Sequence, residues 1–373
     1  MTTEELQSQT IRWLRFPLAV AVVYTHAILP EELQIDLWQT NYKALSGWDV
    51  INIIRVFFTE VFVRVARPCF FMISGFLFYS KIEKWGKQVY IDKIKRRIKT
   101  LLIPYLLWNL IAVIIAAFFL FIRNDSSLVT FWNDLWNNGI LKVFWNYRSN
   151  SYGVTQFGFH LQFYYPYNAP LWFIRDLIMM VFLSPAIYYF LKYTKIIGII
   201  ILGIFFSTEI WIYTPGFSIN AFFFFGLGAY FSIHGKNMII ELRKRTILWL
   251  LLATVSLILS IYNQSVFFQL YIIFGSITII NIASYVLECG RLSTVNKYIL
   301  SLSKTSFFIF ATHIIFLYYS SKLINIIIRS DSVFFLMVKY LTAPIFYVGI
   351  CVGLYYVVNK IAPKVLKVLT GSR

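Results

Sequence analysis

The sequence predicts an all-α fold: a polytopic membrane helical bundle of about ten transmembrane helices, with both termini in the cytoplasm. The first observation is composition, because the 373 residues are 59% hydrophobic and only 13% charged, whereas soluble domains carry roughly 25% charged residues. The second is a series of long apolar runs, and the third is an uneven division of Lys and Arg between alternate loops. We expect a single domain over residues 1–373, without an appended soluble domain.

Ten runs are long and apolar enough to cross a bilayer, which takes about 17–25 helical residues. Glu4 and Glu5 precede the first run and no small-residue cleavage site follows it, so we expect an uncleaved signal anchor. Polar turns at 213–216 and 262–265 separate later runs. The runs are residues 11–29, 53–79, 100–121, 170–190, 196–213, 217–234, 246–262, 266–287, 304–322 and 333–359.

The basic residues orient these runs. Of the 34 Lys and Arg residues, 23 lie in loops on the side of the N-terminus and six lie on the opposite side. Cytoplasmic loops of membrane proteins carry such an excess, so both termini are expected in the cytoplasm. This topology accounts for the net charge of +18, and we expect no nucleic-acid partner. Three cysteines without regular spacing predict neither a disulfide framework nor a metal site.

Two segments between the runs are distinctive. Residues 80–99 form a strongly basic cytoplasmic connection, which either anchors the protein on anionic lipid or docks a phosphorylated cytosolic molecule. The external loop 123–169 is aromatic, with 13 aromatic side chains among the 37 residues from Phe131 to Tyr167. It either lies at the headgroup level as an aromatic belt or forms a roof over a glycan site.

The first run carries two ionisable residues, Arg15 and His26. Eleven helical residues make three turns plus about 20°, so both side chains share one face and are separated by about 16 Å along the axis. Ionisable groups at such depth are costly and mark function by default. The pair is therefore the leading candidate for the functional core.

The second run carries a charged stripe. Glu60, Arg64 and Arg67 fall at positions i, i+4 and i+7 of the expected helix, and Glu60 and Arg64 have the spacing of an intrahelical ion pair. Such a stripe must face the bundle interior or a wet cavity. It either fixes helix packing alone or holds an anionic ligand, since two arginines face one carboxylate.

Later runs add further polar groups. The fourth run opens with Trp172, Arg175 and Asp176, and the Arg-Asp pair either completes salt bridges to neighbouring helices or belongs to a site. His313 lies in the middle of the ninth run, where it is either a satisfied packing residue or a site residue. Most of these groups map to the outer half of the membrane, whereas the cytoplasmic loops are basic. That asymmetry predicts a polar chamber that opens outward and two substrates that enter from opposite sides.

Five motifs in register resemble the acyltransferase-3 family of integral membrane acyltransferases. They are the R-x10-H pair of Arg15 and His26, RPCFFMISGFLFY from Arg67, LLIPYLLWN, PLWFIRDL and FFIFATHIIFL. The resemblance covers essentially the whole chain. It implies transfer of an acyl group, commonly acetyl, from a cytosolic coenzyme A thioester to a hydroxyl of a glycan or another surface molecule, with Arg15 and His26 as the functional core.

Roles for individual residues follow as hypotheses. His26 acts as general base, since burial favours its neutral form, and Arg15 binds the phosphates or the thioester region of the donor. A second group binds acyl-CoA or the oxyanion, and a third lies on the acceptor side. The second group is Glu60, Arg64, Arg67 and His313, and the third is Trp172, Arg175 and Asp176.

We expect no permanently bound cofactor, with acetyl-CoA or another acyl-CoA as donor substrate. The expected partners are a glycan or lipid-linked glycan acceptor and the lipid bilayer of a bacterial inner membrane. Two other functions stay open. One is a transporter or flippase of a lipid-linked sugar or small anion, and the other is a membrane-bound O-acyltransferase of the other large superfamily, for which His313 is the late histidine.

Overall fold

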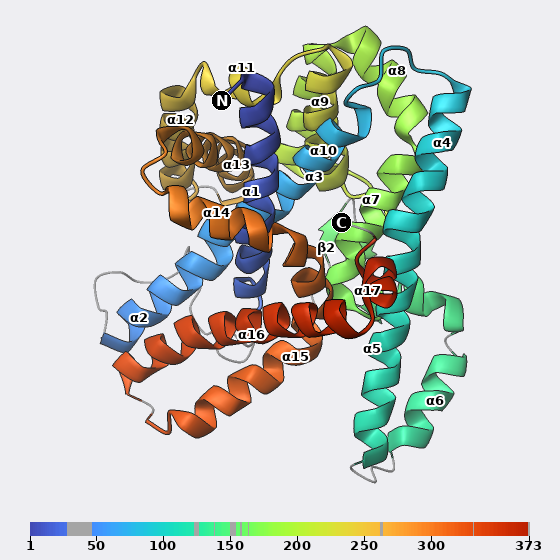
Figure 1. The fold of residues 1–373 in the computed structure, drawn as a ribbon, viewed down its shortest axis with the longest axis vertical. Coiled ribbons are helices and arrows are strands. Elements are labelled where there is room, and N and C mark those ends of the chain that lie inside the picture. Colours follow the sequence, from blue (N-terminus) through green and yellow to red (C-terminus); the bar gives the residue numbers. More distant parts are fainter. Residues whose placement is uncertain are drawn as a thin grey trace.

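The computed structural model describes residues 1–27, 47–122, 127–137, 139–149, 154–156, 159–162, 164–261, 264–330 and 332–371. Within them the chain is mainly helical (Figure 1). The first ten helices are α1 (Thr3–Tyr24), α2 (Gly47–Val56), α3 (Ala66–Tyr79), α4 (Lys87–Arg97), α5 (Ile103–Ile122), α6 (Ser127–Asn137), α7 (Trp172–Phe182), α8 (Ser184–Thr194), α9 (Ile196–Thr208) and α10 (Ile219–Ile233). The others are α11 (Met238–Arg243), α12 (Thr246–Leu259), α13 (Gln264–Cys289), α14 (Ser293–Leu302), α15 (Ser306–Ile327), α16 (Val333–Ile361) and α17 (Pro363–Thr370).

Strand structure in the described chain is confined to the external loop. β1 (Arg148–Ser149) pairs antiparallel with β4 (Tyr164–Tyr165), and β2 (Val154–Gln156) pairs antiparallel with β3 (Phe159–Leu161). These short ladders fold the loop back on itself, so its two ends meet beside α7. The predicted all-α membrane bundle is otherwise confirmed as a helical architecture.

A helix lies within each of the ten predicted apolar runs, but only some are long enough to span a membrane. Among the described residues, five segments are long and apolar enough, and the bent pair α7 and α8 would make a sixth. Helices α9, α10 and α12 are apolar but shorter. The five are Asp49–Tyr79, Lys87–Ile122, Ser265–Cys289, Ser293–Leu317 and Phe334–Ile361. The count of ten spans and the side of each terminus stay predictions.

Two predicted runs depart from straight α-helix. The fourth run bends by 68° between α7 and α8, at Leu183, just before Pro185 in the first turn of α8. Proline has no backbone N–H, and its ring clashes with the carbonyl four residues before it, so it interrupts a continuous helix. In the second run, a π-helical turn at Phe57–Val61 and a 3-10 turn at Phe62–Val65 lie between α2 and α3. The regular register expected for its charged stripe is therefore broken, and π turns of this kind are frequent at functional sites.

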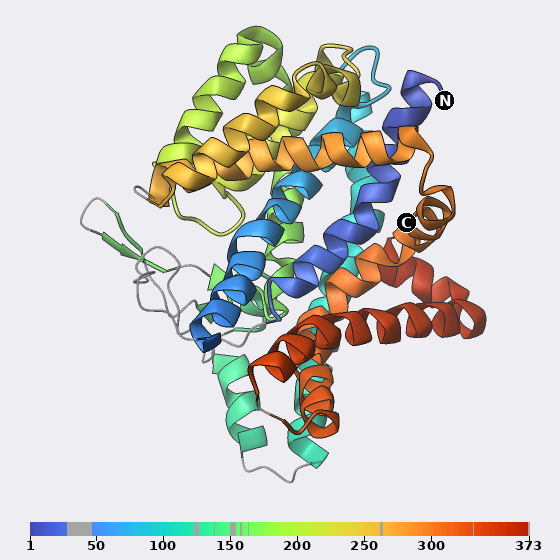
Figure 2. The same cartoon turned by 90° about the vertical axis from the view of Figure 1, so that its left-hand side faces the viewer.

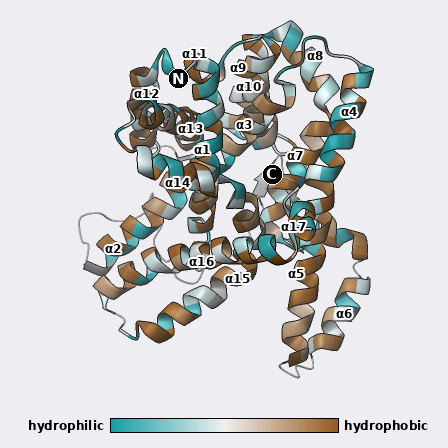
Figure 3. Cartoon of the chain, in the orientation of Figure 1, coloured by the Kyte–Doolittle hydropathy of each residue, from teal (hydrophilic) through white to brown (hydrophobic). Residues whose placement is uncertain are grey.

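The basic connection is helical rather than a loop. Helix α4 continues through a π-helical turn at Ile98–Leu102 into α5, so Lys87–Ile122 is one continuous segment of 36 residues. Figure 3 shows its hydrophilic α4 half and its hydrophobic α5 half. Lys93 Nζ donates to the Phe78 carbonyl oxygen at 2.7 Å, which holds α4 against the end of α3.

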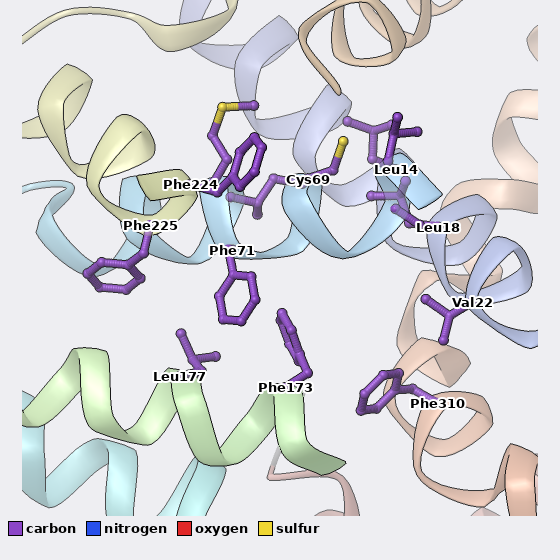
Figure 4. Close-up of a cluster of buried hydrophobic side chains, with 14 of the residues drawn as sticks. Leu14, Leu18, Val22, Cys69, Phe71, Phe173, Leu177, Phe224, Phe225 and Phe310 are labelled. Atoms are coloured by element: carbon purple, nitrogen blue, oxygen red, sulfur yellow. The ribbon is translucent and has the colours of Figure 1, made fainter. Parts of the chain in front are cut away.

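Helices α3 and α10 cross in direct backbone contact. A Cβ on Gly75 would overlap the Phe225 carbonyl, and a Cβ on Gly228 would overlap the Met72 carbonyl. Small residues permit this approach between membrane helices, and it explains the glycine in the ISGF sequence of the second run. The crossing places the inward face of α3 opposite α7 and α15, where buried side chains of the core meet (Figure 4).

The two ends of the described chain lie on the same half of the molecule as α4 (Figure 2). At the amino end, Trp13 Nε1 of α1 donates to Asn296 Oδ1 of α14 at 3.0 Å. At the carboxyl end, α17 packs on α5, and Trp108 Nε1 donates to the Leu369 carbonyl oxygen at 2.9 Å. Gly371 follows with φ +66° and lies against the Thr100 backbone, where a Cβ would clash.

Candidate active site

Two cavities lie between α1, α3, α7 and α15. We call the first the cation cavity, because Arg15, Arg96, Arg97 and Lys304 line it, and it has a volume of about 420 Å³. The second is the histidine cavity, of about 260 Å³, whose polar wall consists of Thr25, His26, Arg64, Arg67, Tyr165 and Trp172. Arg15 and His26, eleven residues apart on the first run, thus line different cavities.

The cation cavity gathers basic side chains from three segments. Arg15 comes from α1, Arg96 and Arg97 from the end of α4, and Lys304 from the 3-10 turn Ser303–Thr305. No Asp or Glu is among its lining residues, and none of the four cations forms an ion pair within the described chain. Four like charges without a carboxylate produce a strongly positive potential that attracts anions such as phosphate.

His26 lies two residues beyond the end of α1. Its backbone N–H donates to the Val23 carbonyl oxygen at 3.1 Å, which continues the last turn of the helix. The residue is exposed, and its side chain lines the histidine cavity. A histidine in this position can exchange a proton with a molecule in the cavity.

Arg64 and Arg67 share the cavity wall but differ in their partners. Arg64 forms the predicted ion pair with Glu60, which partly neutralises it. Arg67 stacks over the Trp172 ring, with Cζ 5.5 Å from the ring centroid, and its Nε has no hydrogen-bond partner in the described part of the chain. Arg67 therefore retains donors for an anionic group. Glu60 itself does not line the cavity.

His313 lies directly behind His26. The two ring centroids are 5.1 Å apart, and His313 is fully buried and lines neither cavity. Its Nδ1 is 2.6 Å from the Phe310 carbonyl oxygen. Because a carbonyl only accepts, Nδ1 must carry the proton. The neutral ring then has a lone pair on Nε2, which has no hydrogen-bond partner among the described residues.

Arg175 and Asp176 lie away from both cavities. Their side chains are 5% and 1% exposed and form an ion pair at 3.1 Å. Arg175 Nη1 also donates to the backbone oxygens of Trp145 at 2.7 Å and Tyr164 at 3.0 Å. These contacts tie the loop 123–169 to α7. They differ from the salt bridges to neighbouring helices that the structural interpretation of the pair predicts. Of the three residues expected on the acceptor side, Trp172 alone lines a cavity.

The end of the external loop covers the histidine cavity. Tyr165, Ala169 and Pro170 are part of its wall, and the roof over a glycan site stays a prediction. Trp132 and Trp136 of α6 are 51% and 81% exposed, which is typical of an aromatic belt. Of the segment 150–163, the structure describes only residues 154–156 and 159–162, so the prediction for the remaining positions lies outside the described residues.

Sequence reasoning missed many lining residues, among them Lys304, Tyr165, Phe173 and Phe310. Phe173 and Phe310 lie in the quoted motifs PLWFIRDL and FFIFATHIIFL, but nothing in the sequence marks either one as a site residue. For the basic stretch 80–99 the sequence predicts either an anchor on anionic lipid or a docking surface for a phosphorylated molecule. The structure places only two of its residues, Arg96 and Arg97, in the cation cavity.

The cation cavity lies next to the histidine cavity in a helical membrane protein. This arrangement is compatible with an enzyme that transfers a group from an anionic donor. Comparison with known proteins defines the class further, because the model of an acyltransferase domain, that of the acyltransferase-3 family, matches residues 9–359. The chain therefore belongs to the acyltransferase-3 family, as its motifs predicted, and is a membrane acyltransferase.

One relative covers nearly the whole chain. It is the succinoglycan biosynthesis protein ExoH of Rhizobium meliloti (strain 1021), which is 25% identical over 391 residues, an alignment covering 98% of this chain and 92% of the relative. No solved structure matches the chain.

Proposed function

We propose that the protein is an O-acyltransferase that moves an acyl group, most commonly acetyl, from cytosolic acyl-CoA to a hydroxyl of a cell-surface or lipid-linked glycan. One observation carries the proposal: the cation cavity and the histidine cavity share two wall residues, Phe173 and Phe310. An anion-binding site and a candidate general base are therefore adjacent, as a phosphorylated thioester donor requires.

The cation cavity is the proposed donor site. Coenzyme A carries several phosphate charges at one end and the thioester at the other. Arginine and lysine without carboxylate partners bind phosphate through charge-assisted hydrogen bonds, and four such groups line this cavity. Loops rich in Lys and Arg adjoin it, which favours a cytoplasmic entrance. The donor would bind with its phosphates at Arg15, Arg96, Arg97 and Lys304 and its thioester toward Phe173 and Phe310.

The histidine cavity is the proposed site of chemistry. Neutral His26 takes the proton from the acceptor hydroxyl, and the hydroxyl oxygen attacks the thioester carbonyl carbon. Arg67, which lacks an ion-pair partner in the described chain, stabilises the negative charge on the carbonyl oxygen. Collapse of the tetrahedral intermediate forms the ester and breaks the C–S bond, and the proton on His26 passes to the departing thiolate.

The acceptor would enter from the opposite side, beneath the end of the external loop. Trp172 and Tyr165 line the histidine cavity, and aromatic rings present apolar faces on which a sugar ring can stack. The name of the relative, a succinoglycan biosynthesis protein, supports a glycan as acceptor. His313 would position His26 rather than touch either substrate, because it is buried behind it.

Membranes that contain the protein and its glycan acceptor test the proposal when supplied with radiolabelled acetyl-CoA. Label should enter the glycan fraction with wild-type protein and be lost with His26→Ala. His234→Ala is the matched control, because His234 contacts the Leu191 carbonyl at 3.2 Å and lines neither cavity. A transporter would transfer no label, and full transfer by His26→Ala would contradict the role of this residue.

A further inference from the structure

Two aromatic residues separate the two cavities. Phe173 of α7 and Phe310 of α15 are the lining residues that the cation cavity and the histidine cavity have in common. Their rings meet edge to face, with centroids 5.8 Å apart and an interplanar angle of 71°. Figure 4 shows both rings directed into the space between their helices. A group that moves directly from one cavity to the other would pass beside these two rings.

The packing behind each ring limits how far it can move. Phe173 lies against Phe71 of α3, with centroids 4.3 Å apart, and Phe71 is fully buried. The Phe310 ring lies against the buried ring of His313, with centroids 5.8 Å apart. The side chains of Phe173 and Phe310 are only 6% and 7% exposed. Both rings are therefore packed, and a wide opening between the two cavities would require them to rotate.

We propose that Phe173 and Phe310 form an aromatic constriction that selects the acyl group by size. The inference rests on the proposed function, because it assumes that a thioester bound in the cation cavity reaches His26. A short acyl group passes between the rings, whereas each added methylene must displace them further. Fixed apolar walls can discriminate between chain lengths by about tenfold or more per methylene.

The test measures transfer of three donors, acetyl-, butyryl- and hexanoyl-CoA, each radiolabelled in the acyl group and supplied to membranes that contain the full-length protein. The quantity compared is the ratio of hexanoyl to acetyl label in the glycan fraction. Phe173→Ala and Phe310→Ala should each raise this ratio by at least about tenfold. Phe310→Trp, which enlarges the ring, should reduce butyryl transfer more than acetyl transfer.

Phe231→Ala is the matched control. Phe231 of α10 is 7% exposed, as Phe310 is, but it lines neither cavity. The hexanoyl-to-acetyl ratio of Phe231→Ala should equal that of the wild type. Its stability should fall, because it loses buried apolar surface as Phe310→Ala does. Phe173→Leu and Phe310→Leu replace the alanine variants if those do not accumulate in the membrane, and they should shift the ratio in the same direction by a smaller factor.

The outcomes separate this inference from the proposed function. If Phe173 and Phe310 variants that accumulate in the membrane keep the wild-type ratio, the constriction does not select the acyl group and this inference is wrong, while the transferase assignment stands. If wild-type protein transfers no label from any of the three donors, the proposed function itself fails, and the constriction fails with it.

Discussion

His26 and Arg67 are the two side chains to which the account assigns the chemistry. His26 is exposed at the wall of the histidine cavity, and the ring of His313 lies behind it at 5.1 Å. Arg67 lies on the same wall with its guanidinium over Trp172. In the proposed mechanism, neutral His26 accepts the proton and Arg67 supplies positive charge where the oxyanion develops.

Replacement of His26 by alanine should remove general-base catalysis. Such a loss typically lowers kcat by about 10²- to 10⁴-fold, whereas the dissociation constant for acetyl-CoA should stay unchanged because the donor phosphates bind elsewhere. Single-turnover transfer together with equilibrium binding of CoA would check both quantities. A weakened affinity with unchanged kcat would mean that His26 binds the donor instead.

Replacement of Arg15 or Lys304 by glutamine should weaken binding of acetyl-CoA and leave kcat nearly unchanged. Loss of one charge-assisted hydrogen bond, worth about 1.5–3 kcal/mol, should raise the KM for acetyl-CoA by about tenfold or more and change kcat little. Arg12→Gln on the same helix is the control, since Arg12 is exposed, contacts Ser303 at 3.4 Å and does not line the cavity. An equal effect of Arg12→Gln would point to the general charge of this face rather than to a site.

At the scale of elements, the crossing of α3 and α10 sets the position of the cavity walls. Gly75 and Gly228 allow the two backbones to touch, and this contact fixes the face of α3 that carries Ser74 and Phe70 into the cation cavity. The preceding π and 3-10 turns direct Arg64 and Arg67 into the other cavity. One segment, Asp49–Tyr79, thus contributes to both sites.

Gly75→Ala should destabilise the protein because its Cβ would overlap the Phe225 carbonyl, which belongs to a helix backbone and cannot move aside. Overpacking of this kind costs about 1–3 kcal/mol. A thermal unfolding measurement in detergent should show a lower midpoint for Gly75→Ala. Gly349→Ala is the control, since its Cβ meets nothing within 4 Å, and an equal fall in both variants would contradict the role of the crossing.

The apolar runs predicted where helices form, but not how many are long enough to span a membrane. The spacing of Glu60 and Arg64 predicted their ion pair. Periodicity contains no information on irregular turns, so the π turn at Phe57–Val61 was not predicted. The bend between α7 and α8 was also missed, although Pro185 in the fourth run is a signal for a kink. The Phe173–Phe310 contact joins helices far apart in the chain. Such pairings depend on tertiary packing, which local pattern does not encode.

At the scale of the whole molecule, the two cavities differ in charge: basic side chains line one, and His26 and aromatic residues line much of the other. Arg15 of α1 and Arg96 and Arg97 of α4 line the cation cavity, and Gly371 near the carboxyl end is also part of its wall. Tyr165, Ala169 and Pro170 of the loop 123–169 line the histidine cavity. This division is what a donor from the cytoplasm and an acceptor from outside require. The sequence predicted the asymmetry from loop charges, whereas the adjacency of the two cavities emerges only in three dimensions.

The cysteines offer a test of the orientation. Cys289, at the end of α13, is exposed, whereas Cys69 and Cys351 are buried. If the termini are cytoplasmic, a membrane-impermeant maleimide should leave intact spheroplasts unlabelled and should modify Cys289 after permeabilisation. Cys289→Ser should abolish that labelling. Modification of Cys289 in intact spheroplasts would reverse the assigned topology, and with it the side from which the donor enters.

The most direct test of the central claim is mass spectrometry of surface glycans from cells that express the wild-type protein, His26→Ala or His234→Ala. If the protein is an O-acyltransferase with His26 as general base, glycans gain the mass of one acyl group with the wild-type and His234→Ala proteins. This added mass is absent with His26→Ala. The same acylated glycan in cells with His26→Ala, at the wild-type level, would contradict the account.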